Sequence, residues 1–235
     1  MKAFLTVFLA LFSMFSTIYG QDQNLENLKT DDKKRLRFGY YVGLNSVGAK
    51  MEYLPTSSGQ PFRIVVEPKP SFDVGLLADM RINEFLNIRF HPGVAFIERE
   101  IRFPNYVSSS KLLRERIVKS NYVRLPIGIK LNTRRIRNVR PYIMGSMSYN
   151  INITSEETHP EDNNSGTFRM RNKMYAWEFA IGTDIYLPYF KFTPSVHGVF
   201  ALNNELVPDN DPNSDFTRHI ASMKSRGVFV RFTFE

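Results

Sequence analysis

The stretch YVRLPIGIKL, from Tyr122 to Leu131, decides the fold of this chain. Its aliphatic side chains share one parity, at Val123, Leu125, Ile127, Ile129 and Leu131, while Tyr122, Arg124, Gly128 and Lys130 share the other. A period of two is typical of a β-strand with one apolar and one polar face. The apolar face runs for about ten residues, the length that a tilted strand needs to cross a bilayer. The stretch therefore predicts a membrane-crossing strand.

Seven further segments repeat this alternation. We therefore predict an all-β fold, an eight-stranded antiparallel transmembrane β-barrel of the bacterial outer membrane. The expected strands cover residues 37–53, 71–82, 86–103, 116–131, 140–153, 173–187, 190–202 and 223–235. Long connections (54–70, 104–115, 154–172, 203–222) alternate with short ones (83–85, 132–139, 188–189), as in barrels with long extracellular loops and short periplasmic turns. This alternation predicts periplasmic N- and C-termini.

Two irregularities are expected in these strands. The apolar parity of the third strand changes near Ile97, because Ile101 and Phe103 continue on the odd side, and such a change suggests a bulge. Prolines within predicted strands remove ladder donors, so bulges or strand ends are expected there; these are Pro92, Pro126, Pro141 and Pro194.

The start of the chain predicts export. Met1 and Lys2 precede an apolar run from Ala3 to Phe15, and a plausible cleavage site lies before Gln21. The run is shorter than the ~20 residues of a spanning helix. We therefore expect a signal peptide over residues 1–20, a polar periplasmic lead segment over 21–36 and the barrel over 37–235. The chain has no cysteine, which excludes a lipid-anchored lipoprotein and disulfides.

Composition narrows the class of protein further. The formal net charge is +8, but an exported chain rarely meets nucleic acid, so lipid head groups or an acidic partner protein are the better candidates. A soluble lipocalin-like barrel shows similar alternation. Charged or small polar residues on the second face of nearly every strand, and the aromatic final strand RGVFVRFTFE, favour the outer-membrane barrel.

The polar faces of the strands predict a charged lumen. An eight-stranded barrel leaves an interior just wide enough for side chains, so ion pairs are expected to fill it as a structural plug, with a proton or ion path as the alternative. The lumen residues expected are Asp73, Asp79, Arg81, Arg89, Arg124, Lys130, Glu178, Asp184 and Arg231, together with His91 and His197.

Two basic clusters lie at opposite ends of the predicted barrel. One is expected to face lipopolysaccharide phosphates at the outer rim, with a merely solvated rim as the alternative; its residues are Arg99, Arg102, Arg114, Arg116, Lys119, Arg171 and Lys173, near Lys111 and Arg169. The second basic cluster lies in the one large periplasmic turn and predicts a docking site for a periplasmic partner. The cluster consists of Arg134, Arg135, Arg137 and Arg140.

Two loop regions contain residue types that can serve in catalysis or calcium binding. His159 and His219, near Asp162, Asp215 and Ser222, would suit a rim hydrolase, but no nucleophile motif surrounds them and loop residues of these types mostly form turns. The loop from Asp209 to Asp215 has oxygen ligands on alternate residues, yet it lacks the glycine and closing glutamate of a calcium loop. No enzyme activity, cofactor or metal is expected.

Four motifs carry a resemblance to a known family: YVRLPIGIKL, the following RPYIMGSMSY, KFTPSVHGVF and the closing FVRFTFE. With them the chain resembles the PorT-like outer-membrane barrel family over nearly its whole mature length. The resemblance implies a non-enzymatic accessory or assembly component of the type IX protein-secretion and gliding-motility machinery, acting beside larger partner proteins. The alternative is a stand-alone barrel that binds a surface ligand or lipopolysaccharide through its extracellular loops, residues 54–70 and 203–222.

Overall fold

The computed structural model describes residues 26–28, 30, 33–54, 64–102, 115–154, 169–207 and 220–235. The expected signal peptide lies outside them. No helix in the described part of the chain is long and apolar enough to cross a membrane. The strands are β1 (Leu36–Tyr53), β2 (Val65–Arg81), β3 (Leu86–Phe90), β4 (Gly93–Arg102), β5 (Glu115–Asn132), β6 (Val139–Asn152), β7 (Lys173–Tyr186), β8 (Lys191–Ala201) and β9 (Ile220–Phe234).

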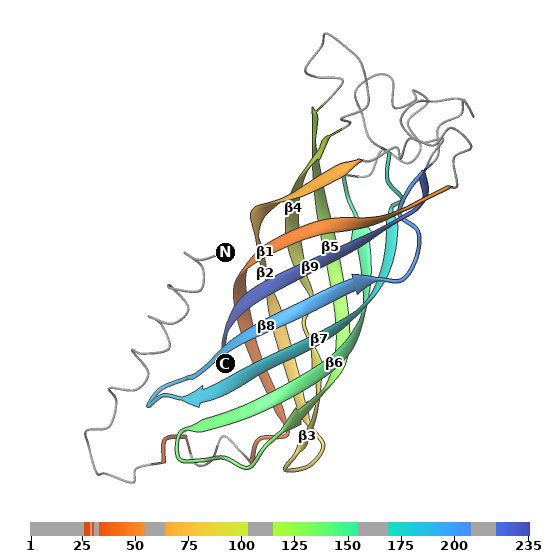
Figure 1. The fold of residues 1–235 in the computed structure, drawn as a ribbon. Helices are drawn as coiled ribbons and strands as arrows, with labels where there is room; N and C mark the ends of the chain where they lie inside the picture. The colour runs from red at the N-terminus through yellow and green to blue at the C-terminus, as the bar shows by residue number, and fades with distance from the viewer. Residues whose placement is uncertain are drawn as a thin grey trace.

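The strands close into a ring of antiparallel neighbours (Figure 1). The final strand β9 pairs with β1 from Tyr40 opposite Phe234 to Tyr53 opposite Ile220. The other neighbour of β1 is β2, and both β3 and β4 lie between β2 and β5. Nine strand segments therefore occupy eight positions, which confirms the predicted all-β antiparallel barrel.

The extra segment arises because one strand is interrupted at His91 and Pro92. The register against β5 is the same on both sides of the gap, with Phe90 opposite Ile127 and Gly93 opposite Arg124. The carbonyl of Pro126 accepts from the His91 amide at 3.1 Å, so the side of Pro126 that lacks an N–H faces this gap. Pro126 therefore fits into β5 without the bulge that the sequence suggested.

The other two prolines also lie where the ladder is weak. Pro141 is the third residue of β6, and its carbonyl accepts from the Thr133 amide beyond the end of β5. Pro194 lies at a break in the pairing of β7 with β8, which omits Thr193 and Pro194.

The bulge expected in the strand containing Ile97 is in fact in the neighbouring strand β2. The pairing of β4 with β5 is continuous, whereas the register of β2 against β4 shifts between Lys69 and Asp73. The parity of β4 does not change: Ile97 and Ile101 are buried inside the barrel. They misled the prediction because the interior at this end of the barrel is apolar.

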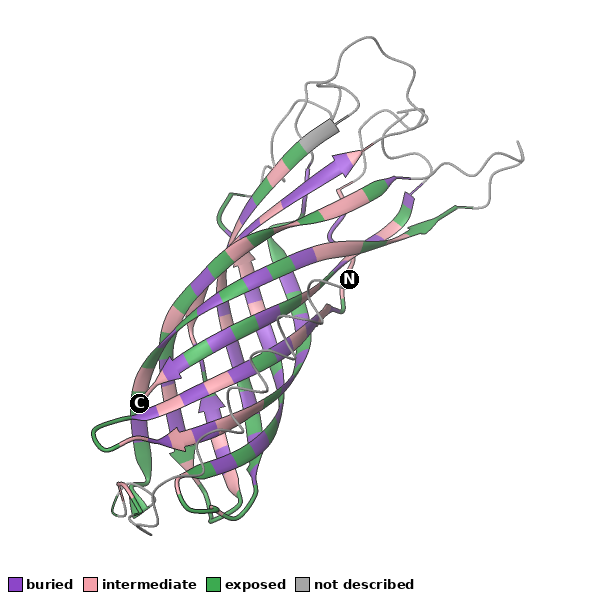
Figure 2. Cartoon of the chain, turned by 60° about the vertical axis from the view of Figure 1, so that its left-hand side comes forward, coloured by how far each residue is buried: buried purple, intermediate pink, exposed green. Residues whose placement is uncertain are grey.

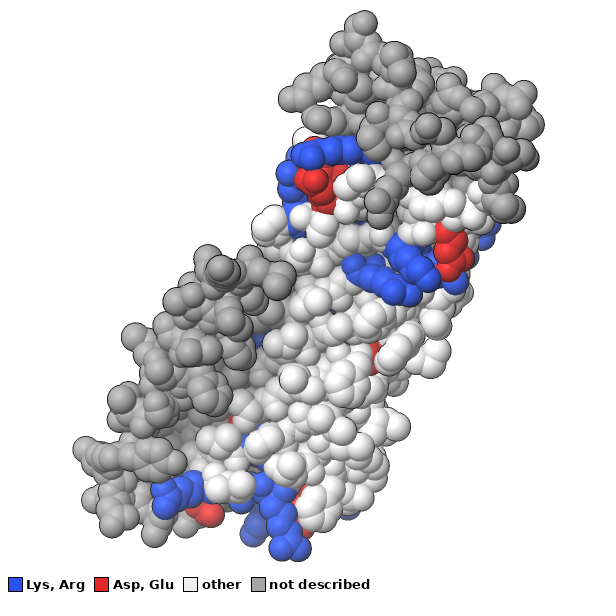
Figure 3. All heavy atoms as spheres, viewed as in Figure 1, with Lys and Arg blue, Asp and Glu red and all other residues white. Residues whose placement is uncertain are grey.

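The outer face of the barrel is a belt of large apolar side chains. Exposed fractions reach 70% at Phe38, 65% at Leu76 and 57% at Ile127. Buried and exposed residues alternate along the strands (Figure 2), and a mainly white band separates two levels of charged side chains in the space-filling view (Figure 3). Exposing this area to water would be costly, so the belt is built to face lipid.

The two ends of the barrel differ in the length of their connections. At the short-turn end, residues 82–85, 133–138 and 187–190 join neighbouring strands, and both Leu36 and Phe234 lie there. At the long-loop end, the links span residues 54–64, 103–114, 153–172 and 202–219. The first of these is shorter than the expected 54–70, because β2 begins at Val65.

Candidate functional site

A charged network closes the lumen at the short-turn end, and Asp79 of β2 is at its centre. Arg89 binds this carboxylate with N–O distances of 2.6 and 2.7 Å. Arg37 lies 3.7 Å from it, and the Asn87 amide donates to it. The terminal amino group of Arg89 that contacts Asp79 also contacts Glu235 at 2.9 Å. Residues from β1, β2, β3 and the chain beyond β9 are therefore joined across the lumen.

Asp184 of β7 continues the network on the opposite wall. Lys130 of β5 contacts both oxygens of this carboxylate, at 2.6 and 2.8 Å, and the Thr193 hydroxyl donates to it at 3.0 Å. Lys191 of β8 lies 3.9 Å from Asp184 and 2.5 Å from Glu235. Acids and bases thus alternate around the lumen, which offsets the cost of burying them.

Two further ion pairs lie higher in the lumen. Arg231 of β9 donates to Asp73 of β2 at 2.7 Å, and its guanidinium lies 4.7 Å from the centre of the Tyr41 ring. Arg124 of β5 donates to Glu178 of β7 and, at 3.1 Å, to Asn150 of β6. These pairs connect strands that are not neighbours, so they brace the barrel across its interior.

Apolar side chains fill the lumen above these pairs. Val47, Ile97, Tyr122, Met174 and Phe229 belong to one buried cluster at this level. A cavity of about 10 Å³ lies among them, which is room for one water at most. The described lumen is therefore a packed interior and not a channel.

A folded segment covers the lumen at the long-loop end. Glu205, on the link from β8 to β9, is fully buried and accepts from the Ser225 amide at 2.7 Å and from its hydroxyl at 2.9 Å. The Tyr122 hydroxyl donates to the same carboxylate at 3.2 Å, and Arg99 donates to Ser225 at 3.1 Å. Leu206 packs beside Glu205 in a second apolar cluster. We call residues 203–207 the cap segment.

The structure brings most of the sequence-predicted lumen residues together. All of them except Arg81 have at most 3% of their surface exposed, and His91 and His197 lie among them. Arg81 instead is half-buried at the short-turn end and donates to the Asn83 carbonyl. Sequence reasoning missed the buried partners Arg37, Lys191, Glu205 and Glu235.

The predicted lipopolysaccharide rim is only partly at the surface. Lys119, Arg171 and Lys173 are exposed, and Arg102 is half-buried in pairs with Glu67 and Glu100. The assignment of Arg99 to this rim was wrong, because its side chain points into the lumen and is fully buried. Lys111, Arg114 and the side chain of Arg116 lie outside the described residues, and Arg169 is buried.

Only some arginines of the predicted docking turn are exposed. Arg134 and Arg137 are exposed. Arg140 is buried and donates to the carbonyls of Thr133 and Glu84, so its assignment to a docking surface was wrong. Arg135 donates to the carbonyl of Asn27 and stacks on Tyr186 at 3.8 Å.

Asn27 shows that part of the lead segment lies against this turn. Its backbone amide donates to the side-chain oxygen of Asn138 at 2.8 Å, and its side-chain amide donates to the Tyr186 carbonyl at 3.0 Å. The turn therefore presents two exposed arginines beside a docked piece of its own chain.

The loop residues considered for catalysis or calcium binding, His159, His219, Asp162 and Asp209 to Asp215, lie outside the described residues. Ser195 and His197 are 3.0 Å apart, but both are buried in the packed lumen. Among the described residues, no group of three or more His, Asp or Glu side chains is placed to hold a metal.

The chain was compared with proteins of known structure and with curated sequences. The chain is similar in fold to OprG from Pseudomonas aeruginosa, at 12% identity and a TM-score of 0.45 over 85% of this chain and 93% of that one. It is also similar to neisserial surface protein A (12%, TM-score 0.41, 85% and 98%) and to AlkL, solved in lipid bilayers (13%, TM-score 0.42, 92% and 92%). No curated protein matches it in sequence.

Family membership rests on a different comparison, made with a sequence model of the family. Residues 20–207 match the model described as outer membrane protein beta-barrel domain. The match covers most of the chain, including β1 to β8. The chain therefore belongs to the outer membrane protein β-barrel domain family and is an integral outer-membrane protein.

Proposed function

We propose that this barrel is a non-enzymatic accessory or assembly component of the type IX protein-secretion machinery, with its short-turn end in the periplasm. The residue-level resemblance of β5, β6, β8 and β9 to the PorT-like family supports this assignment. A signal peptide over residues 1–20 would direct the chain to the outer membrane. The alternation of short and long connections supports periplasmic termini.

The observation that carries the proposal is the packed lumen. Ion pairs cross it at the levels of Asp79, Asp73 and Glu178, and the cap segment covers its far end. A folded or extended cargo protein has no path through such an interior. The barrel would therefore contribute to export through its surfaces, beside a larger conduit.

The short-turn end offers the surface for a periplasmic partner. Arg134 and Arg137 are exposed there, and Arg135 holds the docked lead segment at Asn27. Exposed arginines favour an acidic partner surface, because guanidinium groups bind carboxylates in bidentate pairs. Arg137 also adopts a left-handed backbone with φ of 56°, which directs the tip of the turn.

Affinity purification from native outer membranes tests this role. We expect secretion proteins to travel with the tagged chain and to be lost when Arg134→Glu and Arg137→Glu are combined. The matched control is Arg171→Glu with Lys173→Glu, two exposed cations at the opposite end. Recovery of the wild type without partners, together with normal export in a deletion strain, would refute the proposal.

The exposed cations of the long-loop end favour a second candidate, a stand-alone barrel that binds a surface ligand. Replacing residues 54–63 and 208–219, which leaves the cap segment in place, would then abolish function while protein export stays normal. Export that fails whenever the barrel is absent argues for the first candidate instead.

A further inference from the structure

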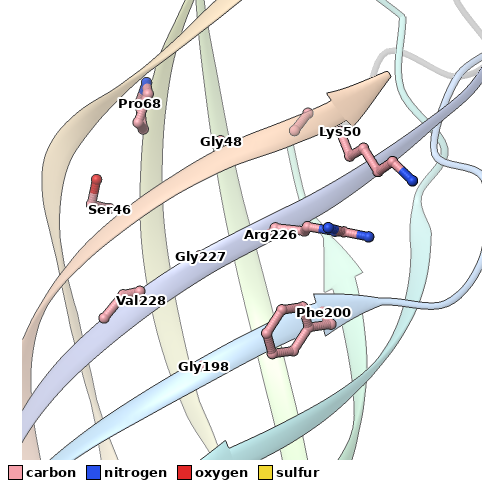
Figure 4. A pocket seen from close by; sticks show the side chains of 10 residues that line it. Ser46, Gly48, Lys50, Pro68, Gly198, Phe200, Arg226, Gly227 and Val228 are labelled. Carbon is pink, nitrogen blue, oxygen red and sulfur yellow. The ribbon is translucent and has the colours of Figure 1, made fainter. Parts of the chain in front are cut away.

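A groove of about 520 Å³ interrupts the apolar belt on the outside of the barrel (Figure 4). It lies over β1, β9 and β8, next to Pro68 of β2, towards the long-loop end. Its lining combines glycines with apolar and basic side chains: Ser46, Gly48, Ala49, Lys50, Pro68, Gly198, Phe200, Arg226, Gly227 and Val228.

The register of the strands orders these residues by height. Trp177, Phe200, Arg226 and Gly48 pair in sequence across four strands, so they form one row around the barrel, and Pro68 lies beside Gly48. The row contains the chain's single tryptophan, and aromatic and basic side chains of this kind mark the boundary between head groups and acyl chains.

The next row, one step further into the belt, contains the floor of the groove. Ser46 and Gly198 belong to it, on either side of Val228. Both residues are small where the surrounding belt has large apolar side chains. The groove is therefore a hollow in the acyl-chain region that opens towards the basic row.

Gly48 is not required by the packing of the barrel. A Cβ there would meet only Pro68 atoms, at 3.9 Å and beyond, and its backbone is not left-handed. By contrast, a Cβ at Gly93 or Gly75 would collide with the Tyr41 hydroxyl. The glycine instead leaves the space beside Pro68 open, and a larger side chain at this position would fill it.

Two cations border the open side of the groove, and Figure 4 shows their side chains extending along it in the same direction. Arg226 lies over the Phe200 ring, 6.0 Å from its centre, and forms no ion pair with a described residue. The ammonium of Lys50 contacts Glu52 at 3.4 Å, where both side chains are about half exposed. Both remain available to an anionic group.

We propose that this groove binds one molecule of lipid A, the phosphorylated glycolipid of the outer leaflet. Its phosphate would contact Arg226 and Lys50, and one acyl chain would lie over Gly48, Ser46 and Gly198. An apolar hollow beneath a pair of cations complements an amphiphile with an anionic head. The choice of lipid A rests on the extracellular orientation of the long-loop end, but not on any role in secretion.

Native mass spectrometry of the refolded, purified chain tests this binding without partner proteins. Lipid A, dephosphorylated lipid A and phosphatidylglycerol are titrated separately. We expect one lipid A to be retained on the wild type, with Gly48→Leu lowering the bound fraction about tenfold by filling the hollow. Arg226→Gln lowers it about fivefold.

The matched control is Gly145→Leu. Gly145 of β6 faces outward in the same row as Gly198, and a Cβ there meets nothing within 4 Å. Its lipid A binding should equal that of the wild type. Equal binding by Gly48→Leu and the wild type would refute the site. Equal binding of phosphatidylglycerol or of dephosphorylated lipid A would refute lipid A as the occupant.

Discussion

At the scale of single residues, the charges of the lumen act as braces because their partners lie on distant strands. Glu178 of β7 and Arg124 of β5 are separated by β6, yet each has at most 2% of its side chain exposed. A buried ion pair adds little net stability over apolar packing, but removal of one partner leaves an uncompensated charge. The strand arrangement therefore depends on both members being present.

Glu178→Gln is expected to lower the free energy of unfolding by about 3–5 kcal/mol, because Arg124 is then buried without its counter-ion. Denaturant titration in detergent micelles, followed by the fluorescence of Trp177, measures this change. The double variant Arg124→Met with Glu178→Met should recover most of the loss. A single variant as stable as the wild type would show that Arg124 gains water or another acceptor.

Alternation predicted most of the lumen residues, and the same parity continues to inward-facing residues at the strand ends that the prediction left out. Lys191 shares the parity of Thr193 and His197, and Glu235 shares that of Arg231. Both therefore point inward, where they pair at 2.5 Å. Their pairing itself could not be read from the sequence, because it depends on the register of β8 against β9.

At the scale of elements, the cap segment closes the barrel through one carboxylate. Glu205→Ala removes the acceptor of two Ser225 donors and of the Tyr122 hydroxyl, at about 1–3 kcal/mol for each donor left without a partner. We expect faster hydrogen exchange at the Ser225 amide and faster proteolysis near residues 203–207.

Glu52→Ala provides the comparison for the cap segment, since Glu52 is an exposed acid at the same end of the barrel. It should leave both rates unchanged. Unaltered exchange at Ser225 in Glu205→Ala would mean that apolar packing of Leu206, and not the carboxylate, holds the segment.

The upper half of β4 shows why the sequence misplaced one group of residues. Its inward side chains Ile97 and Ile101 are apolar, whereas the outward Glu98 and Arg102 are charged, the reverse of the usual pattern in the strands. Alternation therefore indicated the wrong face there, and Arg99 was assigned to the outer rim. The cap segment gave no sequence signal at all, because Glu205 lies in an irregular link.

At the scale of the whole molecule, the packed lumen predicts a barrel that does not conduct ions. Reconstituted into planar bilayers, the chain should show no steady ion conductance, because eight strands leave an interior that side chains fill. A water-filled porin in the same membranes is the positive control. Regular conductance steps from the wild type would contradict the closed interior and revive the ion-path alternative.

The interruption at His91 and Pro92 has a consequence for how the barrel finds its alignment during assembly. A slip of β5 by one residue would reverse its apolar and charged faces. A slip by two preserves the faces, so alternation alone does not prevent it. Pro126 prevents a slip by two residues, because only in the native alignment does its nitrogen, which carries no hydrogen, lie opposite the gap between β3 and β4. Pro92 and Pro126 therefore select one alignment from those that the pattern of apolar residues cannot distinguish.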